Sequence, residues 1–276
     1  MSLKRSKAVA ALANMFFPGL GYLYVGRLRY AIIFPLLLIL LLAISAWLKF
    51  IFTPLGFALT YIFILTILLV GIVSASAIAH RSEAEELKKF QRWFVYLGFI
   101  IVSSLVNDFL RTQRTTLFGY DAHRIPSSSM SQTLTSGDFI VSNTWSYNER
   151  GPVRGDIVTF SGPNDASQMF VKRVIGVPGD LVEINNGQLT VNHKVFKEDY
   201  VSEHNNRRSK EQDISFQVPK ESYYLLGDNR DNSHDGRHLG AIPRSKIIGK
   251  ASHIWFSYHP EEGMKINRIG DRLNDL

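Results

Sequence analysis

The chain of 276 residues contains no cysteine. Disulfide bonds, thiol catalysis and thiolate metal sites are therefore excluded, and any domain outside the cytoplasm must be held together by its core alone. Charged residues are also scarce in the first two-fifths of the chain, where uncharged runs cover residues 8–26, 30–48, 50–79 and 93–107. We predict a membrane domain over residues 1–112 and a second domain, of ordinary soluble composition, over residues 113–276.

Three of these runs are predicted to cross a membrane. A hydrocarbon core of ~30 Å needs about 20 apolar residues in a helix. The last run reaches this length when it is extended to residue 110, with Asp108 at the interface. We therefore expect spans at about 30–48, 54–79 and 93–110.

The first run, residues 8–26, is interrupted by Pro18, Gly19 and Gly21, which break a helix midway. Basic residues flank it on both sides, and the positive-inside rule places both flanks in the cytoplasm. A re-entrant or interfacial segment satisfies this rule, and a fourth full span is the alternative. Carried along the chain, the same rule places everything after Arg111 outside the cytoplasm.

The formal net charge of +7 raises the question of a nucleic-acid partner. Many of the basic residues are the topological anchors of the spans, and the sequence has no Cys-His finger or RNA-binding aromatic motif. We therefore expect contact with anionic membrane phospholipid and no nucleic acid. The oligomeric state is left open.

From about residue 115 the chain consists of short β-rich runs separated by turn residues. Asn-Gly at 186–187, between the runs LVEI and LTV, predicts a hairpin. No long segment repeats apolar residues with the period of a helix. We predict a mainly-β domain of packed, bent antiparallel sheets, with a small inserted subdomain at about 181–222.

The run VKRVIGVPGD, residues 171–180, places two cations in a segment that otherwise has the composition of a buried strand. Strand alternation sends Lys172 and Val174 to one face and Val171 and Arg173 to the other. Lys172 either extends to water along its apolar stem or is held in a dry site, where burial lowers the pKa of its amine and lets it act as a base. Arg173 is expected to be an exposed partner of a carboxylate.

Two other segments contain groups that can meet such a lysine. IPSSSMSQTLTSGDF (125–139) has three consecutive serines just before a strand, and a neutral lysine can activate a serine nucleophile. Serine clusters are most often only turns, so this pattern alone is weak. GDNRDNSHDGRHLGAIP (227–243) is a run of polar residues able to form a hydrogen-bonded loop that orients other groups.

In chain order these segments resemble the signature motifs of bacterial type I signal peptidases, also called leader peptidases. IPSSSMSQTL resembles the serine box of that family, RGDIVTF its strand box, VKRVIGVPGD its lysine box and GDNRDNSHDGRHLGAIP its final box. The resemblance covers about residues 120–270 with gaps. It implies a membrane-bound serine endopeptidase, without a cofactor, that removes signal peptides from secreted preproteins after small-x-small sites. The resemblance does not extend to the membrane region; together with the predicted spans and their flanking charges it leads us to expect a multi-pass protein of the bacterial cell membrane, with the catalytic domain on the periplasmic or extracellular side.

Carried over position by position, the resemblance makes Ser129 the nucleophile and Lys172 its general base. A desolvated lysine is uncharged near neutral pH and can take the seryl proton directly, so no histidine is needed. The backbone N–H of Ser129 and the hydroxyl of Ser127 match the family's oxyanion hole.

In the final box, Ser233 matches the serine that bonds the lysine amine, and Asp235 and Arg237 match the pair that braces the site. The residues that match those lining the family's shallow pockets for small side chains are Ile125, Met130, Phe170 and Val171. Three residues depart from the family pattern: Gln132, Gly236 and His238. These departures leave the rigidity of the turn and the shape of the pocket in question, and they do not affect the dyad.

Two classes of alternative remain at this point. One is a relative with the same dyad, such as a conjugative pilin-maturing peptidase or a self-cleaving repressor; the other is a membrane scaffold with a catalytically dead domain. A metal site is not expected, because the acidic and histidine residues of the final box fit no zinc or calcium-loop spacing. These residues are Asp228, Asp231, His234, Asp235 and His238.

Overall fold

The structure is a computed structural model, and it describes residues 5–81, 87–162, 165, 168–207 and 213–273. The chain divides into two compact units. The first is helical and comprises Met1–Ile51 and Leu55–Phe118; the second is mostly β and comprises Phe52–Pro54 and Gly119–Leu276. Apolar helices followed by a mainly-β domain of bent antiparallel sheets are the predicted fold class, which is confirmed.

Three helices of the first unit are long and apolar enough to cross a membrane: α3 (Leu28–Trp47), α4 (Pro54–Arg81) and α5 (Trp93–Thr112). They occupy the segments for which spans were expected, and most of their large apolar side chains are exposed. Such a surface is suited to a lipid solvent, in which a helix satisfies all its backbone hydrogen bonds internally.

The preceding segment forms two short helices, α1 (Lys7–Phe16) and α2 (Leu20–Tyr24). The break between them falls at Gly19, whose φ of 103° is readily adopted only by glycine. At 1.5 Å per residue, the 10 residues of α1 are too few to cross a hydrocarbon core. The helices pack against the unit's core, where the Tyr22 hydroxyl lies 2.5 Å from the Ser74 hydroxyl. The re-entrant or interfacial segment stays a prediction, with which these two short helices are compatible.

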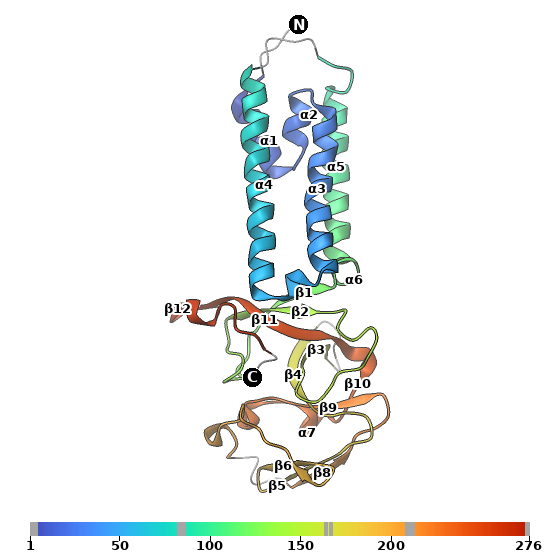
Figure 1. The fold of residues 1–276 in the computed structure, drawn as a ribbon, viewed down its shortest axis with the longest axis vertical. Coiled ribbons are helices and arrows are strands. Elements are labelled where there is room, and N and C mark those ends of the chain that lie inside the picture. Colours follow the sequence, from blue (N-terminus) through green and yellow to red (C-terminus); the bar gives the residue numbers. More distant parts are fainter. Residues whose placement is uncertain (1–4, 82–86, 163–164, 166–167, 208–212, 274–276) are drawn as a thin grey trace. The chain divides into compact units, whose positions relative to one another are not determined.

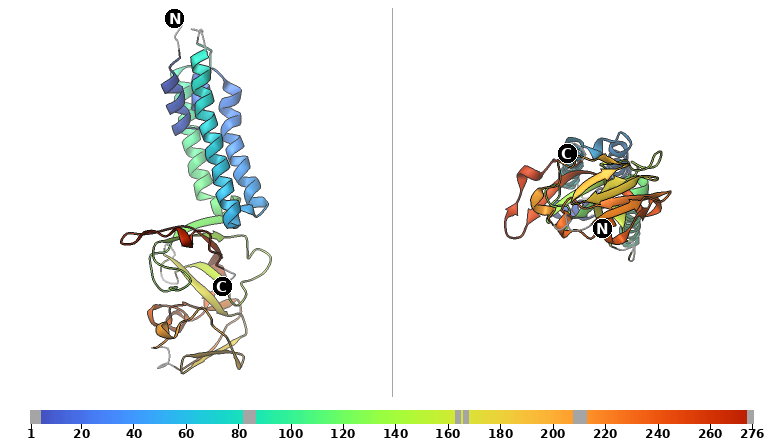
Figure 2. Two further views of the ribbon diagram at one scale, coloured as in Figure 1. Left: turned by 60° about the vertical axis from the view of Figure 1, so that its left-hand side comes forward. Right: turned by 90° about the horizontal axis from the view of Figure 1, so that it is seen from below.

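The second unit is built on an antiparallel sheet of eight strands within the described residues, in the order β1-β2-β11-β3-β4-β9-β10, with β12 paired to β11. The strands are β1 (Tyr120–Arg124), β2 (Asp138–Asn143), β3 (Ile157–Ser161), β4 (Met169–Gly176), β9 (Ser222–Leu226), β10 (Ile242–Pro243), β11 (Ile247–His259) and β12 (Gly263–Met264). Strand β11 pairs with both β2 and β3, and its register shifts at three places. Such irregularities bend a strand and increase its twist, which produces the curvature seen in Figures 1 and 2.

A second antiparallel sheet has the order β7-β6-β5-β8. Its strands are β5 (Leu181–Asn185), β6 (Gln188–Val191), β7 (Lys194–Val195) and β8 (Ile214–Gln217). Asn186 and Gly187 join β5 to β6 with φ of 47° and 76°, the positive values that a two-residue hairpin of this type requires. The two sheets share an apolar core, in which Ile175 and Leu226 of the first pack with Val182 of the second.

The remaining short helices lie in connections: η1 (Phe50–Phe52), α6 (Arg114–Leu117), η2 (Glu203–Asn205), η4 (Arg230–Asn232), α7 (Gly236–Leu239), η5 (Arg244–Lys246) and η6 (Ile266–Arg268). Three parts of the β unit position the candidate site. These are the interior strand β4, the turn between β1 and β2 (residues 126–134), and the loop that follows β9 (residues 227–237).

Candidate active site

The turn at residues 126–134 presents Ser129 at the sheet. Met130 and Leu134 fix the turn, because both are buried in an apolar cluster and the Leu134 N–H donates to the Met130 carbonyl at 2.7 Å. The 227–237 loop holds it from the other side, since the backbone N–H of Asn229 donates to the Ser129 carbonyl at 3.1 Å. The Asn229 side chain also donates to the Ser128 carbonyl at 3.0 Å. The serine is therefore anchored by its backbone while its hydroxyl stays accessible.

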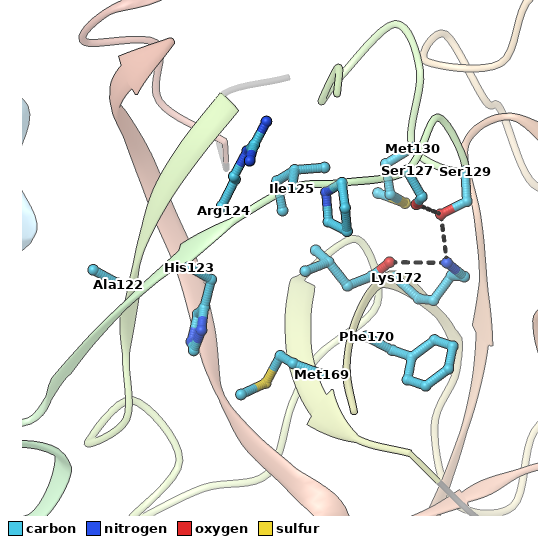
Figure 3. A pocket seen from close by; sticks show the side chains of 12 residues that line it. Ala122, His123, Arg124, Ile125, Ser127, Ser129, Met130, Met169, Phe170 and Lys172 are labelled. Atoms are coloured by element: carbon cyan, nitrogen blue, oxygen red, sulfur yellow. Dashed lines mark hydrogen bonds between the residues drawn. The ribbon is translucent and has the colours of Figure 1, made fainter. Parts of the chain in front are cut away.

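Lys172 lies on β4, between β3 and β9, and is 3% exposed. Its Nζ lies 2.7 Å from the Ser129 Oγ and also donates to the Val171 carbonyl at 3.1 Å (Figure 3). Burial lowers the pKa of this amine from 10.5 to about 8, although the carboxylates of Asp235 and Asp228 act in the opposite direction. Of the two possibilities left open by the sequence, the buried lysine is the one observed.

The hydroxyl of Ser127 lies 3.2 Å from that of Ser129. Both residues line one cavity of about 400 Å³, together with Lys172 (Figure 3). The four predicted pocket residues also line this cavity: Ile125, Met130, Phe170 and Val171. The sequence did not single out the remaining lining residues, which are Ala122, His123, Arg124, Pro126 and Met169.

Asp235 and Arg237 form a buried ion pair. The Arg237 Nε donates to Oδ1 of Asp235 at 2.8 Å and Nη2 donates to Oδ2 at 2.9 Å, while the Gly227 N–H donates to Oδ2 at 2.9 Å. Burial raises the pKa of the Asp235 carboxyl, but the hydrogen bonds and charge of Arg237 outweigh it and hold the pKa below its ordinary value. An ionised Asp235 thus closes the base of the 227–237 loop.

Ser233 lies beside the dyad. Its hydroxyl has no partner of good hydrogen-bond geometry among the described residues, but it is close enough to the Asp235 carboxylate to help lower the pKa of that group. The expected bond to the Lys172 amine is therefore not formed, and the two hydrogen bonds of that amine go to Ser129 and Val171. A Cβ placed on Gly227 would lie 2.2 Å from the Ser233 hydroxyl and 2.5 Å from the Ser129 carbonyl oxygen. Gly227 is thus needed for the close approach of the loop to the nucleophile.

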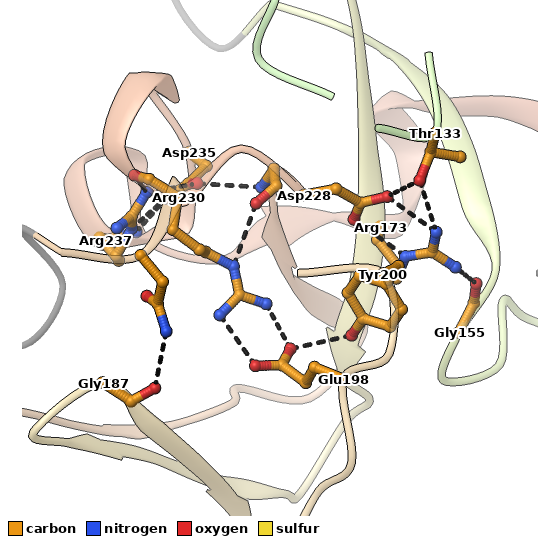
Figure 4. A network of polar contacts seen from close by, with 12 residues as sticks. Thr133, Gly155, Arg173, Gly187, Glu198, Tyr200, Asp228, Arg230, Asp235 and Arg237 are labelled. Carbon is orange, nitrogen blue, oxygen red and sulfur yellow. Dashed lines mark hydrogen bonds and ion pairs between the residues drawn. The ribbon is translucent and has the colours of Figure 1, made fainter. Parts of the chain in front are cut away.

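The expectation of an exposed Arg173 is wrong, because this residue is 1% exposed. Its Nε and Nη2 donate to the two carboxylate oxygens of Asp228 at 2.9 and 2.8 Å, and Nη1 donates to the Gly155 carbonyl at 3.0 Å (Figure 4). The Thr133 hydroxyl donates to the same carboxylate at 2.5 Å. Alternation placed Arg173 on the correct face of β4, but it could not show that this face is covered.

Two of the three acidic residues of the final box are thus engaged in ion pairs, Asp228 with Arg173 and Asp235 with Arg237. The third, Asp231, accepts a hydrogen bond from the backbone N–H of Arg207 at 3.0 Å. His234 and His238 stack on each other at 5.1 Å between ring centroids. Within the described residues, no three histidine or acidic side chains are grouped so as to hold a metal ion. The resemblance had indicated Asp235 and Arg237 as a pair, whereas nothing in the sequence indicated that Asp228 pairs with Arg173.

The chain is similar in sequence to several known proteins. A family model described as signal peptidase, peptidase S26, matches residues 90–256. The probable signal peptidase I-2 of Synechocystis sp. is 39% identical over 140 residues, which are 49% of this chain and 62% of that protein. Signal peptidase I of Leptolyngbya laminosa is 36% identical over 163 residues, which are 56% of this chain and 73% of that protein. Among solved structures, a signal peptidase I from Enterococcus faecalis is 32% identical, with a TM-score of 0.32, over 37% of this chain and 97% of that one.

Proposed function

The chain belongs to the signal peptidase family, peptidase S26, and is a serine endopeptidase of that family; we propose that it removes signal peptides from secreted preproteins with Ser129 as nucleophile and neutral Lys172 as general base. The observation that carries the proposal is the distance of 2.7 Å between Lys172 Nζ and Ser129 Oγ. The pKa of about 8 for a buried Lys172 leaves a useful fraction of the amine uncharged near neutral pH.

In the first step, the neutral Lys172 amine takes the proton of the Ser129 hydroxyl as Oγ attacks the scissile carbonyl carbon. The resulting oxyanion is stabilised by the Ser129 N–H and the Ser127 hydroxyl. The Lys172 ammonium then gives its proton to the leaving amine of the mature protein, which leaves an acyl-enzyme. A water molecule, deprotonated by the same amine, releases the signal peptide and restores Ser129.

The cavity beside the dyad supports cleavage after small-x-small sequences. Ile125, Met130, Phe170 and Val171 give it mostly apolar walls, and Met130 is itself anchored in the core. An extended peptide directs alternate side chains to one face, so the residues at −1 and −3 would enter this cavity together. Small side chains fit a shallow site of this kind and bulky ones would hold the carbonyl away from Ser129.

The apolar helices support a place in the bacterial cell membrane, in contact with phospholipid. We assign the β unit to the periplasmic or extracellular side, because basic residues are most numerous just before α3 and between α4 and α5, which the positive-inside rule places in the cytoplasm. Secreted preproteins emerge on that side of the membrane, where the dyad would meet them.

The direct test is cleavage of a purified preprotein by the full-length protein in detergent. The wild-type chain is expected to release the mature protein, and Ser129→Ala is expected to be inactive. Ser131→Ala is the matched control, since it removes a hydroxyl from the same turn and should keep wild-type activity. Cleavage by the Ser129→Ala protein at the wild-type rate would contradict the proposal.

A further inference from the structure

Among the described residues, three arginines have buried side chains around the dyad, and each has a carboxylate partner. Arg173 pairs with Asp228 and Arg237 pairs with Asp235, both within the family motifs. Arg230 pairs with a residue outside those motifs, Glu198, which lies between β7 and β8. A buried charge requires such compensation, so the third carboxylate is as necessary to the arrangement as the other two.

The segment that contains Glu198 turns alternate side chains inward. Lys197 and Asp199 pair with each other at 3.0 Å and are 84% and 78% exposed. The Glu198 side chain is only 10% exposed, and Arg230 donates to both of its carboxylate oxygens, with Nη1 at 3.0 Å from Oε2 (Figure 4). The Tyr200 hydroxyl donates to Oε1 of Glu198 at 2.9 Å.

Tyr200 joins this carboxylate to the strand of the catalytic lysine. The guanidinium carbon of Arg173 lies 3.9 Å from the centroid of the Tyr200 ring, within the range of a cation–π contact. Arg173 follows Lys172 on β4, and its partner Asp228 also receives the Thr133 hydroxyl from the nucleophile turn. Tyr200 therefore covers the ion pair that joins the lysine strand to the nucleophile turn.

Arg230 extends the connection to the 227–237 loop. Its Nε donates to the Gly227 carbonyl at 3.0 Å, and its own carbonyl accepts from Arg237 Nη2 at 2.6 Å. Glu198 thus fixes, through Arg230, the loop that contacts Ser129. Since Glu198 and Tyr200 do not line the substrate cavity, their effect on the reaction must be indirect.

We propose that Glu198 and Tyr200 are positioning residues, which hold Ser129 and Lys172 in reacting geometry through Arg230 and Arg173. This inference rests on the proposed function of the dyad. It adds to the catalytic machinery a segment outside the serine, strand, lysine and final boxes.

The positioning role predicts a specific kinetic signature for Glu198→Gln. The value of kcat should fall at least about tenfold while KM changes less than about twofold, because the loop is displaced but the substrate cavity is intact. The charged groups that act on Lys172 are Asp235, Asp228 and Arg237, all on the 227–237 loop. Glu198→Gln should loosen the loop and change the distances of these charges from Lys172, so the rising limb of the pH profile should move, whereas an undisturbed loop would leave it in place.

Asp199→Asn is the matched control, because it removes the same charge from an exposed neighbouring position and should leave kcat and the pH profile unchanged. Glu198→Asp keeps the charge and should keep the wild-type pH limb with a partial loss of kcat. Tyr200→Phe removes only the hydroxyl bond to Glu198, and Tyr200→Leu also removes the ring over Arg173. We expect the loss of kcat to be about threefold for the first and larger for the second.

Wild-type kcat and pH profile in Glu198→Gln, or a loss that appears only in KM, would overturn the inference. If Glu198→Gln does not fold, Tyr200→Phe decides, since wild-type kcat in that variant would also overturn it. Ser129→Ala and Lys172→Ala are measured with the same substrate. If Ser129→Ala or Lys172→Ala is active, the proposed dyad itself is refuted. If both are inactive and Glu198→Gln is fully active, only the positioning role is refuted.

Discussion

Replacing Lys172 with methionine is expected to abolish activity and, at neutral pH, to stabilise the β unit. The pKa of Lys172 falls from 10.5 to about 8 on folding, chiefly through burial. One pKa unit corresponds to ~1.4 kcal/mol, so the protonated amine costs the folded state about 3 kcal/mol. Methionine has a similar length and no charge. Methionine loses the hydrogen bonds to Ser129 and to the Val171 carbonyl. At ~1 kcal/mol each, these losses offset about 2 kcal/mol of the gain and leave a net stabilisation of about 1 kcal/mol.

The sign of the pH dependence follows from the two pKa values. Below about pH 8 the lysine is protonated in both the folded and the unfolded chain, and the full cost is present. Between about pH 8 and 10.5 the unfolded chain binds more protons than the folded one, so wild-type stability rises with pH relative to the variant. The advantage of Lys172→Met should therefore be largest at or below pH 7 and disappear by about pH 10.5.

Pulse proteolysis in urea, applied to the full-length protein in detergent at several pH values, measures this difference. Lys220→Met is the matched control, because Lys220 is exposed and its replacement should give no pH-dependent gap. A Lys172→Met protein that is less stable than wild type at pH 7 would show that Lys172 is not desolvated at a cost to the folded state. A difference in stability between the two proteins that is the same at every pH would show this too.

Three further results are expected. Changing the −1 alanine of a preprotein to a bulky residue should abolish cleavage, and indifference to this change would exclude the proposed small-x-small specificity. Protease added to intact spheroplasts should digest the chain beyond residue 115 and spare the 81–92 loop; protection of the carboxy-terminal unit would reverse the proposed orientation. Gly227→Ala should reduce kcat at least about a hundredfold, because the new methyl group would lie 2.5 Å from the Ser129 carbonyl oxygen. Gly98→Ala, where a Cβ meets nothing within 4 Å, should be silent, and equal rates for the two variants would show that the loop does not contact the nucleophile turn closely.

The sequence predicted the structure best where a local pattern of residues is compatible with only one local arrangement of the chain. Uncharged runs of sufficient length became α3, α4 and α5, and Asn186-Gly187 became the expected hairpin. The serine and lysine motifs identified two side chains that the fold brings within hydrogen-bonding distance, although 43 residues separate them. The spans and the hairpin follow from backbone geometry, and the serine and the lysine are side chains that the proposed reaction requires.

Prediction failed where burial depends on a distant segment. Arg173 alternates correctly on β4, but the Tyr200 ring and the Asp228 carboxylate cover its face, and nothing in the strand itself indicates either partner. Glu198 stands between two exposed charged residues, Lys197 and Asp199, and nothing in the sequence distinguished it from them or indicated Arg230 as its partner. Ser233 reached the expected neighbourhood without the expected bond, because the positions of hydroxyl groups depend on side-chain geometry that a motif does not specify.

Lys172 is proposed to act as a neutral base, and the rate of single-turnover cleavage of a preprotein across pH measures its protonation during the reaction. The wild-type rate should rise with pH through about pH 8, where the amine loses its proton. Lys172→Arg keeps the charge permanently, since a guanidinium does not deprotonate in this range, and should be as inactive as Lys172→Ala at every pH. A Lys172→Arg protein with near-normal rates would contradict the assignment and leave Ser129 without a proton acceptor.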